Sequence, residues 1–569
     1  MASLDLWFLA DQARFRQERE ELEALAARSV WLTLGAWRLD ASGIVLEFDI
    51  DIGHRVYEAV LRFPETYPHS PAVIRPRDEH ARWSVHQFGA GGDLCLQIRP
   101  DNWSPDLMGW HLVDSAYQLL SGERPAPDVR AEVPSAHRVT EGQQLRTAGS
   151  RLLLTRAIES RLETLEHGQS VSGRTVFSFL SDSVVRVITT LERPDQPDWD
   201  DPEVSGALKV EMYVGRAYIR RLAEAELLPR TASYAEFESD ATNLGWSPEA
   251  DLLVVMDDAG IHAYSAFGER VYKVTIIRAR EARSRLSEET ITLADKRVAI
   301  VGCGSLGSKV ATMLARTGVG AFVLIDDDIL EPDNLVRHDL DWRDVGHHKI
   351  AALSHRLQRV RALVDVSTHT RQVGGQESGT SAATVLMRLA ASDLIIDATA
   401  NPAVANILSG FVQANSLPVV WSEVFAGGVG GLVARCRPGT EPPLPLMRRA
   451  IENWFVERGT SAGTAAGPYE ADVEGPPLVA DDADVTAIAA HAARMAIDLL
   501  IRPDASQFPW SIYVVGMAPC DLFAEPFEVY PIALPKPPPA EPKPDLTQEE
   551  MVDEDNFIRQ LIKRSAGRA

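Results

Sequence analysis

The stretch VAIVGCGSLG, residues 298–307, decides how the second half of this chain folds. Its four apolar residues, mostly β-branched, predict a buried strand, and the glycines that follow predict a turn leading into a helix. A second apolar run, AFVLI at residues 321–325, ends on Asp326. A strand, a glycine-rich turn, a helix, a second strand and an acid, in this order, are typical of a dinucleotide-binding fold.

The glycine-rich turn predicts where a phosphate group would lie. Gly302, Gly304 and Gly307 let the backbone approach a phosphate closely. The N-terminus of the helix that follows adds N–H donors and a partial positive charge. Asp326 is expected to bind the ribose hydroxyls.

Polar and charged residues downstream of Asp326 distinguish ATP from NAD. They are Asp328, Asn334, Arg337 and Lys349. A nicotinamide site needs no converging arginine and lysine, whereas a triphosphate needs fixed cations around its negative charges. The sequence therefore favours ATP binding, and an NAD-dependent oxidoreductase is the alternative.

This arrangement resembles the adenylation domain of the ubiquitin-activating and ThiF/MoeB superfamily. The resemblance implies that residues 291–535 form a Rossmann-like α/β domain in which a protein's C-terminal carboxylate attacks the α-phosphate of ATP. It assigns Arg337 and Lys349 to the phosphates as catalytic residues. It also implies a homodimer formed through this domain.

The same resemblance leads to expectations about a magnesium site and a structural zinc site. Members of the superfamily often read Asp-x-Thr-Asp-Asn after a strand, and the second Asp helps hold magnesium, but this chain has Ala400 there. Mg²⁺ is therefore expected near Asp328 or Asp397, although Asp397 has the alternative role of capping the next helix. Many relatives hold a structural zinc with two Cys-x-x-Cys pairs. This chain has no such pair, so no structural zinc is expected.

Residues 1–145 carry a second set of motifs. These are FPETYPHSP at 63–71, GDLCL at 92–96 and WSP at 103–105, between a predicted helix at 11–27 and another at 112–120. Their order resembles the α+β fold of ubiquitin-conjugating enzymes. The resemblance implies that Cys95 carries a modifier as a thioester. The alternatives are a buried structural cysteine or an inactive relative.

The N-terminal motifs depart from that family in one place. The family usually has His-Pro-Asn before the cysteine, and its Asn helps stabilise the oxyanion, but residues 86–88 here are His-Gln-Phe. His86, Asp101 or Asn102 are the candidates to replace the Asn. Each has the alternative of being an ordinary loop residue.

Four cysteines leave few choices for a second thioester site. Relatives often place an activating cysteine in a crossover segment, which falls here at residues 459–484 and contains none. Cys303 lies in the nucleotide turn and Cys436 in a predicted strand. Cys520 follows a strand and a turn with Gly and Pro, where a thiol is accessible, so it is the candidate activating cysteine; the alternative is that Cys520 is inert.

The rest of the chain is less informative. Residues 146–290 predict an α+β linker domain without a catalytic constellation, with helices at 151–165 and 214–226. Residues 536–569 predict a Pro-rich linker and a charged helix.

Composition limits the functional classes. A length of 569 residues suggests three or four domains. Few cysteines, no signal-peptide pattern and no long apolar run favour a reducing cytoplasm and no membrane partner. The net charge of −24 disfavours nucleic acid as a partner.

A conjugating half before an activating half resembles the bacterial ligases of CBASS antiphage operons and other bacterial ubiquitin-like conjugation systems. This implies a multidomain ligase that adenylates a ubiquitin-like protein or a cGAS-like nucleotidyltransferase. The enzyme would pass the protein through cysteine thioesters and join it to a target lysine, using ATP and Mg²⁺. A catalytically dead scaffold is the other alternative, suggested by the missing Asn near Cys95 and by Ala400.

Overall fold

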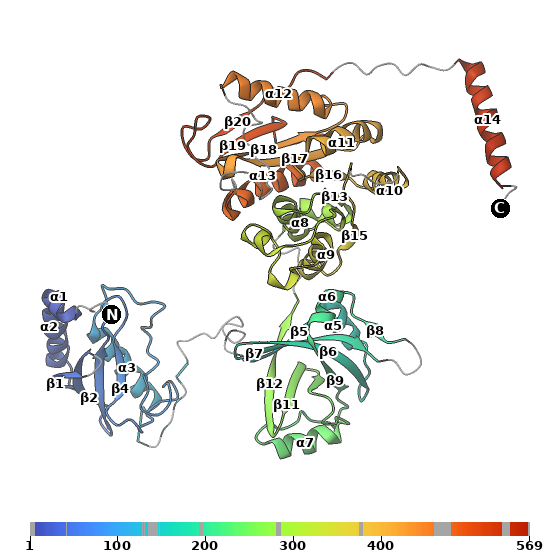
Figure 1. Ribbon diagram of the computed structural model, residues 1–569. Helices are drawn as coiled ribbons and strands as arrows, with labels where there is room; N and C mark the ends of the chain where they lie inside the picture. The colour runs from blue at the N-terminus through green and yellow to red at the C-terminus, as the bar shows by residue number, and fades with distance from the viewer. Residues whose placement is uncertain are drawn as a thin grey trace. The chain divides into compact units, whose positions relative to one another are not determined.

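The structure is a computed structural model of the chain. It describes residues 6–40, 43–127, 129, 131, 133–134, 146, 148–192, 197–279, 286–374, 379–459, 480–537 and 547–566. The chain divides into two compact units, Met1–Thr147 and Ala148–Ala569, and each is described by itself (Figure 1). No helix among the described residues has the length and apolar character needed to cross a membrane.

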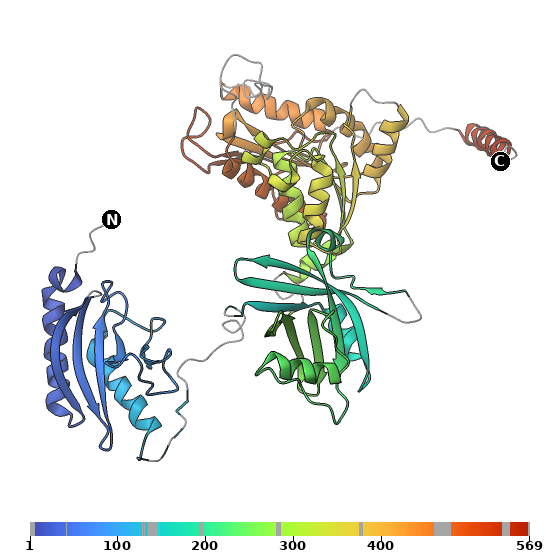
Figure 2. The same ribbon diagram turned by 60° about the horizontal axis from the view of Figure 1, so that its bottom comes forward.

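The first unit is an antiparallel four-stranded meander with helices before and after it. The strands pair in the order β1-β2-β3-β4. The elements are α1 (Trp7–Ala10), α2 (Gln12–Arg28), β1 (Leu32–Asp40), β2 (Gly43–Asp51), β3 (Val56–Phe63), β4 (Val73–Pro76) and α3 (Gly109–Glu123). The helices predicted at 11–27 and 112–120 are confirmed, and α2 lies alongside the sheet (Figure 2).

One core holds the first unit together, and a buried carboxylate ties its proline motif to both long helices. Glu18 of α2 is fully buried and accepts hydrogen bonds from the Tyr67 hydroxyl and from the backbone N–H of Gly109, at 2.8 Å. Arg14 pairs with the same carboxylate at 2.9 Å. Trp103 donates its indole N–H to the carbonyl of Pro68 at 2.7 Å. The FPETYPHSP and WSP motifs therefore contact each other.

A closed sheet forms the first part of the second unit. Its strand order is β5-β12-β11-β10-β9-β6-β7-β8, and β5 pairs with β7 as well as with β12. The strands are β5 (Ser150–Leu154), β6 (Ser170–Leu180), β7 (Ser183–Leu191), β8 (Trp199–Asp200), β9 (Tyr213–Arg221), β10 (Leu252–Asp257), β11 (Gly260–Phe267) and β12 (Arg270–Arg278), and the helices are α5 (Arg156–Glu163), α6 (Gly206–Glu211) and α7 (Tyr234–Asn243).

Two helices predicted in this region are wrong in whole or in part. Residues 151–154 belong to strand β5, and α5 begins only after Thr155, whose hydroxyl caps the N–H of Ile158 at 3.1 Å. Residues 214–221 form most of strand β9. Ala217 and Ile219 are buried between more exposed neighbours, so the real period there is two residues rather than 3.6.

The predicted α/β alternation of the C-terminal part is confirmed. Its sheet runs β15-β14-β13-β16-β17-β18-β19-β20, parallel from β15 to β17 and antiparallel from there to β20. The strands are β13 (Arg297–Val301), β14 (Ala321–Ile325), β15 (Asp365–His369), β16 (Leu394–Asp397), β17 (Val419–Phe425), β18 (Gly430–Cys436), β19 (Ile512–Gly516) and β20 (Val529–Pro531). The helices are α8 (Ser305–Thr317), α9 (Lys349–Val360), α10 (Gly379–Ala390), α11 (Pro402–Asn415), α12 (Leu444–Glu457), α13 (Asp482–Ile501) and the tail helix α14 (Gln548–Ala566).

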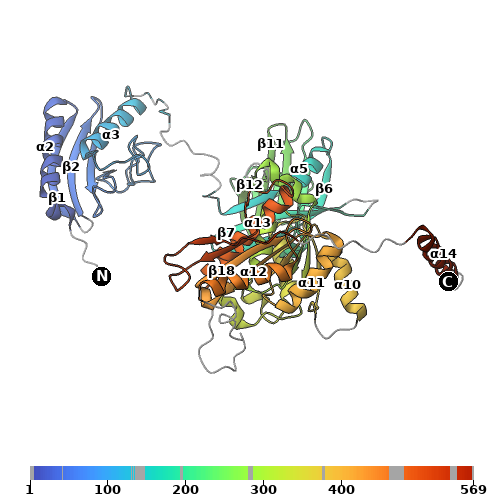
Figure 3. The ribbon, with the colours of Figure 1, turned by 90° about the horizontal axis from the view of Figure 1, so that it is seen from above.

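Helices cover both faces of this sheet. One core packs α8, α9 and α13 against one face, and a second core packs α10, α11 and α12 against the other. Figure 1 shows α12 and α13 on opposite sides of the strands, and Figure 3 shows α10, α11 and α12 gathered on one side. Most of the predicted crossover segment, at 460–479, and of the Pro-rich linker, at 538–546, lies outside the described residues.

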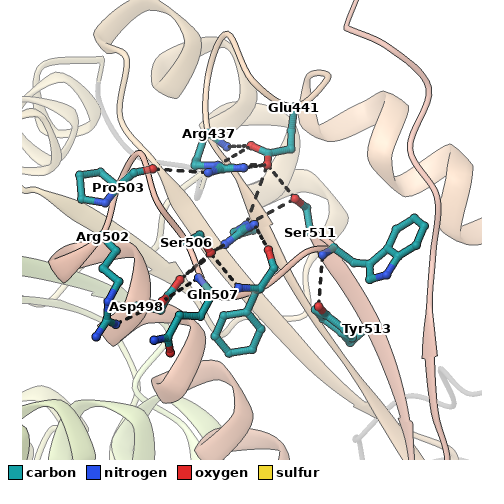
Figure 4. A network of polar contacts seen from close by, with 12 residues as sticks. Arg437, Glu441, Asp498, Arg502, Pro503, Ser506, Gln507, Ser511 and Tyr513 are labelled. Atoms are coloured by element: carbon teal, nitrogen blue, oxygen red, sulfur yellow. Dashed lines mark hydrogen bonds and ion pairs between the residues drawn. The ribbon is translucent and has the colours of Figure 1, made fainter.

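A buried ionic network joins the segment after β18, the end of α13 and the start of β19 (Figure 4). Arg435 is 2% exposed, and its guanidinium lies 3.9 Å from both the Glu441 and the Asp498 carboxylates. Glu441 also pairs with Arg437 at 2.6 Å and accepts the Ser511 hydroxyl at 2.7 Å. The Glu441 carboxylate thus connects the segment after β18 with the start of β19.

Glu441→Ala is expected to destabilise the C-terminal sheet by about 3–5 kcal/mol, because the change leaves Arg435 buried beside one carboxylate instead of two. The measurement is the free energy of unfolding from urea titration of the full chain. Asp365→Ala is the matched control: it breaks the exposed Arg297–Asp365 pair, 3.2 Å apart, and should cost less than about 1 kcal/mol. Equal effects of the two changes would mean that the network adds no stability.

Candidate functional site

A pocket of about 590 Å³ opens at the carboxyl ends of β13, β14 and β16. The chain leaves β13 for β14 on one side and later returns to β16 on the other, so this is the switch point where open α/β sheets bind ligands. The lining residues are Val301, Gly302, Gly304, Ile325, Asp326, Asp327, Asp328, Lys349, Arg371, Gln372, Val373, Ala398, Thr399, Asn401 and Val404.

The three predicted glycines have different roles in the turn. Gly302 has φ +85°, and a Cβ there would lie 2.9 Å from a Thr399 methyl group. A Cβ on Gly307 would lie 2.0 Å from the Gly302 carbonyl oxygen, so only glycine lets α8 pack this closely on the turn. Gly304 faces open space and lines the pocket. The turn thus leaves room for a ligand beside the first N–H groups of α8.

Asp326 lines the pocket, as its predicted role requires, and it also shapes the turn. One carboxylate oxygen accepts the N–H of Cys303 at 2.6 Å, and the other accepts the N–H of Asp328 at 2.9 Å. A ribose contact would therefore use the lone pairs that these two hydrogen bonds leave.

Lys349 and Asp328 form an ion pair at the mouth of the pocket. Lys349 begins α9, its side chain is 10% exposed, and its ammonium pairs with the Asp328 carboxylate, which is 61% exposed. The Lys349 N–H also donates to the Asp328 carbonyl at 3.0 Å. A buried lysine with one exposed carboxylate partner is suited to pairing with a phosphate as well.

Two predicted ligands lie apart from this pocket, and one residue was missed. Asn334 and Arg337 are not among the described residues that line it. The Asn334 amide oxygen accepts the N–H of Glu331 at 3.1 Å, which fixes a local turn. Arg371 lines the pocket two residues beyond the end of β15. An arginine just after a predicted parallel strand was the available signal for it.

Asp397 is buried and is not among the described residues that line the pocket. Its carboxylate accepts both the N–H, at 3.1 Å, and the hydroxyl, at 2.6 Å, of Thr399. Burial raises the pKa of Asp397, and the two Thr399 hydrogen bonds oppose this shift. The capping alternative is wrong, because Asn401 is the residue that caps α11. Asp397 instead holds the turn that carries Thr399 into the pocket.

The cysteines of the C-terminal part differ in access and ionisation. Cys303 is fully buried, and burial raises its thiol pKa well above the usual value. Cys436 is also buried, and the pKa of its thiol is raised to about 12 by the same cause. Cys520 is exposed, in a turn closed by hydrogen bonds with Phe523. It follows β19, which ends at the same sheet edge as β13 and β16.

Cys95 of the first unit is half-buried between the two proline-containing motifs. Its N–H donates to the His86 carbonyl at 2.8 Å. Burial raises the pKa of the Cys95 thiol, and the nearby Asp93 carboxylate raises it further. Asp93 itself pairs with Arg75. The thiol is therefore mostly protonated at neutral pH and needs a base or an opposing charge to react.

The three candidates for the missing Asn all have other partners. A ring nitrogen of His86 lies 2.8 Å from the Val133 carbonyl oxygen. Asp101 pairs with Arg99 at 2.8 Å. Asn102 donates to the Gln97 carbonyl at 2.9 Å and accepts the Arg99 N–H at 2.6 Å. These contacts favour the loop-residue alternative for each of the three.

Asp93→Asn is expected to lower the Cys95 pKa, because it removes a negative charge that disfavours the thiolate. The rate of Cys95 alkylation by iodoacetamide follows the thiolate fraction, so at pH 7 the variant should react several-fold faster. Its pH–rate curve should shift toward lower pH, and the curve is the measurement. Asp78→Asn is the control, since that exposed carboxylate accepts the N–H of His80 and is not among the causes of the Cys95 shift. Unchanged alkylation in Asp93→Asn would contradict the assigned cause.

A model of a known protein family matches the part of the chain that contains this pocket. The model described as "ThiF family" matches residues 280–445, which contain the glycine turn, Asp326, Asp328 and Lys349. Residues 280–445 are therefore similar to ThiF family domains, and this segment is called the ThiF domain. The pocket described above lies within this ThiF domain.

Curated relatives match segments of the chain. The "ATP-dependent ubiquitin transferase-like protein Cap2" of Escherichia coli (strain TW11681) is 31% identical over 140 residues, 24% of this chain and 22% of the relative. The Cap2 protein of Pseudomonas aeruginosa (strain BWHPSA011 / Pa011) is 25% identical over 270 residues, 45% of this chain and 47% of the relative. The chain thus spans less than half the length of either relative.

A solved structure of E. coli MccB with ATP overlaps loosely with this chain. It has a TM-score of 0.34 and 16% identity, and the overlap covers 44% of this chain and 67% of the other.

Proposed function

We propose that this protein is an ATP-dependent conjugation enzyme. It adenylates the C-terminal carboxylate of a ubiquitin-like protein or a cGAS-like nucleotidyltransferase, carries it on cysteines and joins it to a lysine of a target. The observation that carries the proposal is the pocket of the ThiF domain, where the glycine turn faces a buried lysine and an arginine. The similarity to the Cap2 proteins supports the protein substrate.

The pocket has the groups that a triphosphate needs. The N–H groups that begin α8 and the side chains of Lys349 and Arg371 supply positive charge, and Asp326 lies where the ribose hydroxyls would reach it. An NAD oxidoreductase has no use for this lysine and arginine. Arg337 acts on the phosphates only if its segment approaches them when the nucleotide binds.

Asp327 and Asp328 line the same pocket beside Asp326, although no three acidic, His or Cys side chains among the described residues converge on a metal site, so Mg²⁺ would also need oxygens of the phosphates. Hard carboxylate oxygens are the ligands that Mg²⁺ prefers, and aspartates beside a triphosphate need a cation between the two sets of negative charges. Asp327 and Asp328 are the residues that would hold it. Bound Mg²⁺ would neutralise phosphate charge, and Asp397 is too enclosed by Thr399 to share that role.

In the first reaction, a carboxylate oxygen of the protein substrate attacks the α-phosphorus of ATP. The bond from that phosphorus to the bridging oxygen of the β-phosphate breaks, and pyrophosphate leaves with the electron pair. Lys349 and Arg371 stabilise the charge that grows on the leaving phosphates. The product is an acyl-adenylate in which the carboxyl carbon is activated.

In the next two reactions, thiolates take the acyl group. The Cys520 thiolate attacks the acyl carbon and AMP leaves, after which the Cys95 thiolate attacks the thioester and Cys520 is released. The target amine then attacks the Cys95 thioester, the carbon–sulfur bond breaks and the Cys95 thiolate leaves, and the nitrogen loses a proton to give the amide. The exposure of Cys520 and its place at the carboxyl edge of the sheet support its role. A homodimer through the ThiF domain is part of the same proposal.

The test is ATP–pyrophosphate exchange by the full chain with Mg²⁺. The candidate substrates are ubiquitin-like proteins and cGAS-like nucleotidyltransferases with a free C-terminus. Exchange should require the C-terminal carboxylate and disappear when the last residue is amidated. If the chain binds NAD but not ATP, the proposal is wrong. If it binds ATP without any exchange across both substrate classes, the scaffold alternative takes its place.

A further inference from the structure

The backbone of Cys303, in the middle of the glycine turn, is held at both of the peptide groups that flank its Cα atom. Its N–H donates to Asp326 at 2.6 Å, and its carbonyl oxygen lies 2.9 Å from Nε2 of His338. Gly302, just before it, is packed against Thr399 with φ +85°. Asp326 therefore restrains the peptide group between Gly302 and Cys303, and His338 restrains the one between Cys303 and Gly304.

The hydrogen bonds of His338 fix which nitrogen carries the proton. Nδ1 accepts the N–H of Leu340 at 3.2 Å, so the proton is on Nε2, which donates to the Cys303 carbonyl. His338 is 7% exposed, and burial lowers its pKa; the charges of Lys349 and Lys309 lower it too, whereas the hydrogen bond to Cys303 and the charge of Asp339 oppose the shift. The ring is therefore neutral, with one donor and one acceptor, and both are used.

The residue after His338 anchors this segment to two helices. Asp339 accepts the Thr312 hydroxyl of α8 at 2.7 Å and pairs with Arg356 of α9 at 3.3 Å. Its N–H lies 3.4 Å from the Ser308 hydroxyl oxygen. His338 thus holds the turn from a fixed position, and it is not among the described residues that line the pocket.

We propose that His338 is a positioning residue for the phosphates of the bound nucleotide. By holding the Cys303 carbonyl, it aims the N–H groups at the start of α8 into the pocket. This inference rests on the proposed ATP site, and it gives His338 a role that involves no contact with the nucleotide. It also predicts that the effect reaches only the phosphate part of the ligand, because the turn faces the phosphates.

His338→Gln and His338→Asn form a matched pair for the test. The Gln amide N–H₂ occupies about the place of Nε2 and reaches the Cys303 carbonyl, whereas the Asn amide is about one bond too short. Both affinities are measured on the full chain with Mg²⁺. ATP affinity is measured by the fluorescence of bound N-methylanthraniloyl-ATP as ATP displaces it, and adenosine affinity is measured by calorimetry. His338→Gln should keep ATP affinity within about threefold, and His338→Asn should lose about tenfold or more. Adenosine affinity should stay unchanged in both.

Each outcome separates this inference from the proposed function. If His338→Asn loses affinity for ATP and for adenosine equally, His338 supports the fold only. The same conclusion follows if His338→Gln and His338→Asn lose ATP affinity equally. Unchanged ATP affinity in His338→Asn would also overturn the inference. Wild-type protein that binds no ATP would instead refute the proposed function. Unfolding midpoints measured for both variants show that the comparison is made on folded protein.

Discussion

Lys349→Ala is expected to lower the rate of ATP–pyrophosphate exchange by about 10²–10³-fold, the range found when one fixed donor to a developing charge is removed. Lys349 is the cation that begins α9 and lines the pocket, with its side chain 10% exposed. Its partner, Asp328, is mostly exposed and is readily hydrated when the lysine is removed. The loss should therefore be in activity, with little change in stability.

Lys296→Ala is the matched control for this prediction. Lys296 pairs with Asp393 at 3.4 Å and precedes β13, at the sheet edge opposite the pocket. It should exchange pyrophosphate at the wild-type rate. Near-normal exchange in folded Lys349→Ala would remove this lysine from the phosphate site and leave Arg371 as the only pocket cation among the described lining residues.

The two cysteine variants should stop conjugation at different stages, each by several orders of magnitude, because each removes a nucleophile. Cys520→Ala should keep pyrophosphate exchange and place no modifier on Cys95. Cys95→Ala should keep exchange and retain the modifier on Cys520 as a band that a reductant removes. Non-reducing gels with ATP, Mg²⁺ and the modifier are the measurement.

Cys436→Ala is the control for the loss of a thiol. Cys436 is fully buried, and its sulfur lies 3.6 Å from the Pro442 carbonyl oxygen, so its removal should leave the charging of Cys95 unchanged. Normal charging of Cys95 in the Cys520→Ala variant would mean that the acyl group passes directly from the adenylate to Cys95. That result would refute the relay and leave adenylation intact.

The parts of the fold that could be predicted from the sequence are those in which local pattern and burial agree. Strands β13 and β14 are continuous apolar runs because both faces of the sheet are covered by helices. The glycine turn was predictable because Gly302 and Gly307 meet steric demands within one short segment. Asp326 and Lys349 could also be predicted, because Asp326 directly follows a predicted strand and Lys349 directly precedes a predicted helix.

The parts that could not be predicted depend on pairing between distant segments. Arg371 reaches the pocket only because β15 pairs with β14, which a single sequence does not reveal. His338 has no pattern of its own, and its role depends on contacts with Cys303, 35 residues earlier in the chain. The sequence of strand β9 wrongly predicts a helix, because its alternation of buried Ala217 and Ile219 is short and flanked by arginines.

The closed sheet between β5 and β12 has a consequence for how the chain is made. Strand β5, at the start of this sheet, is paired on one side with β7 and on the other with β12, the last strand of the sheet to leave the ribosome. Until Arg278 has been synthesised, β5 and β11 each carry an open edge, and open edges invite pairing with other chains. Nascent chains that stop before β12 would therefore be the ones that depend on chaperones. Every residue that lines the nucleotide pocket lies after β12 in the sequence.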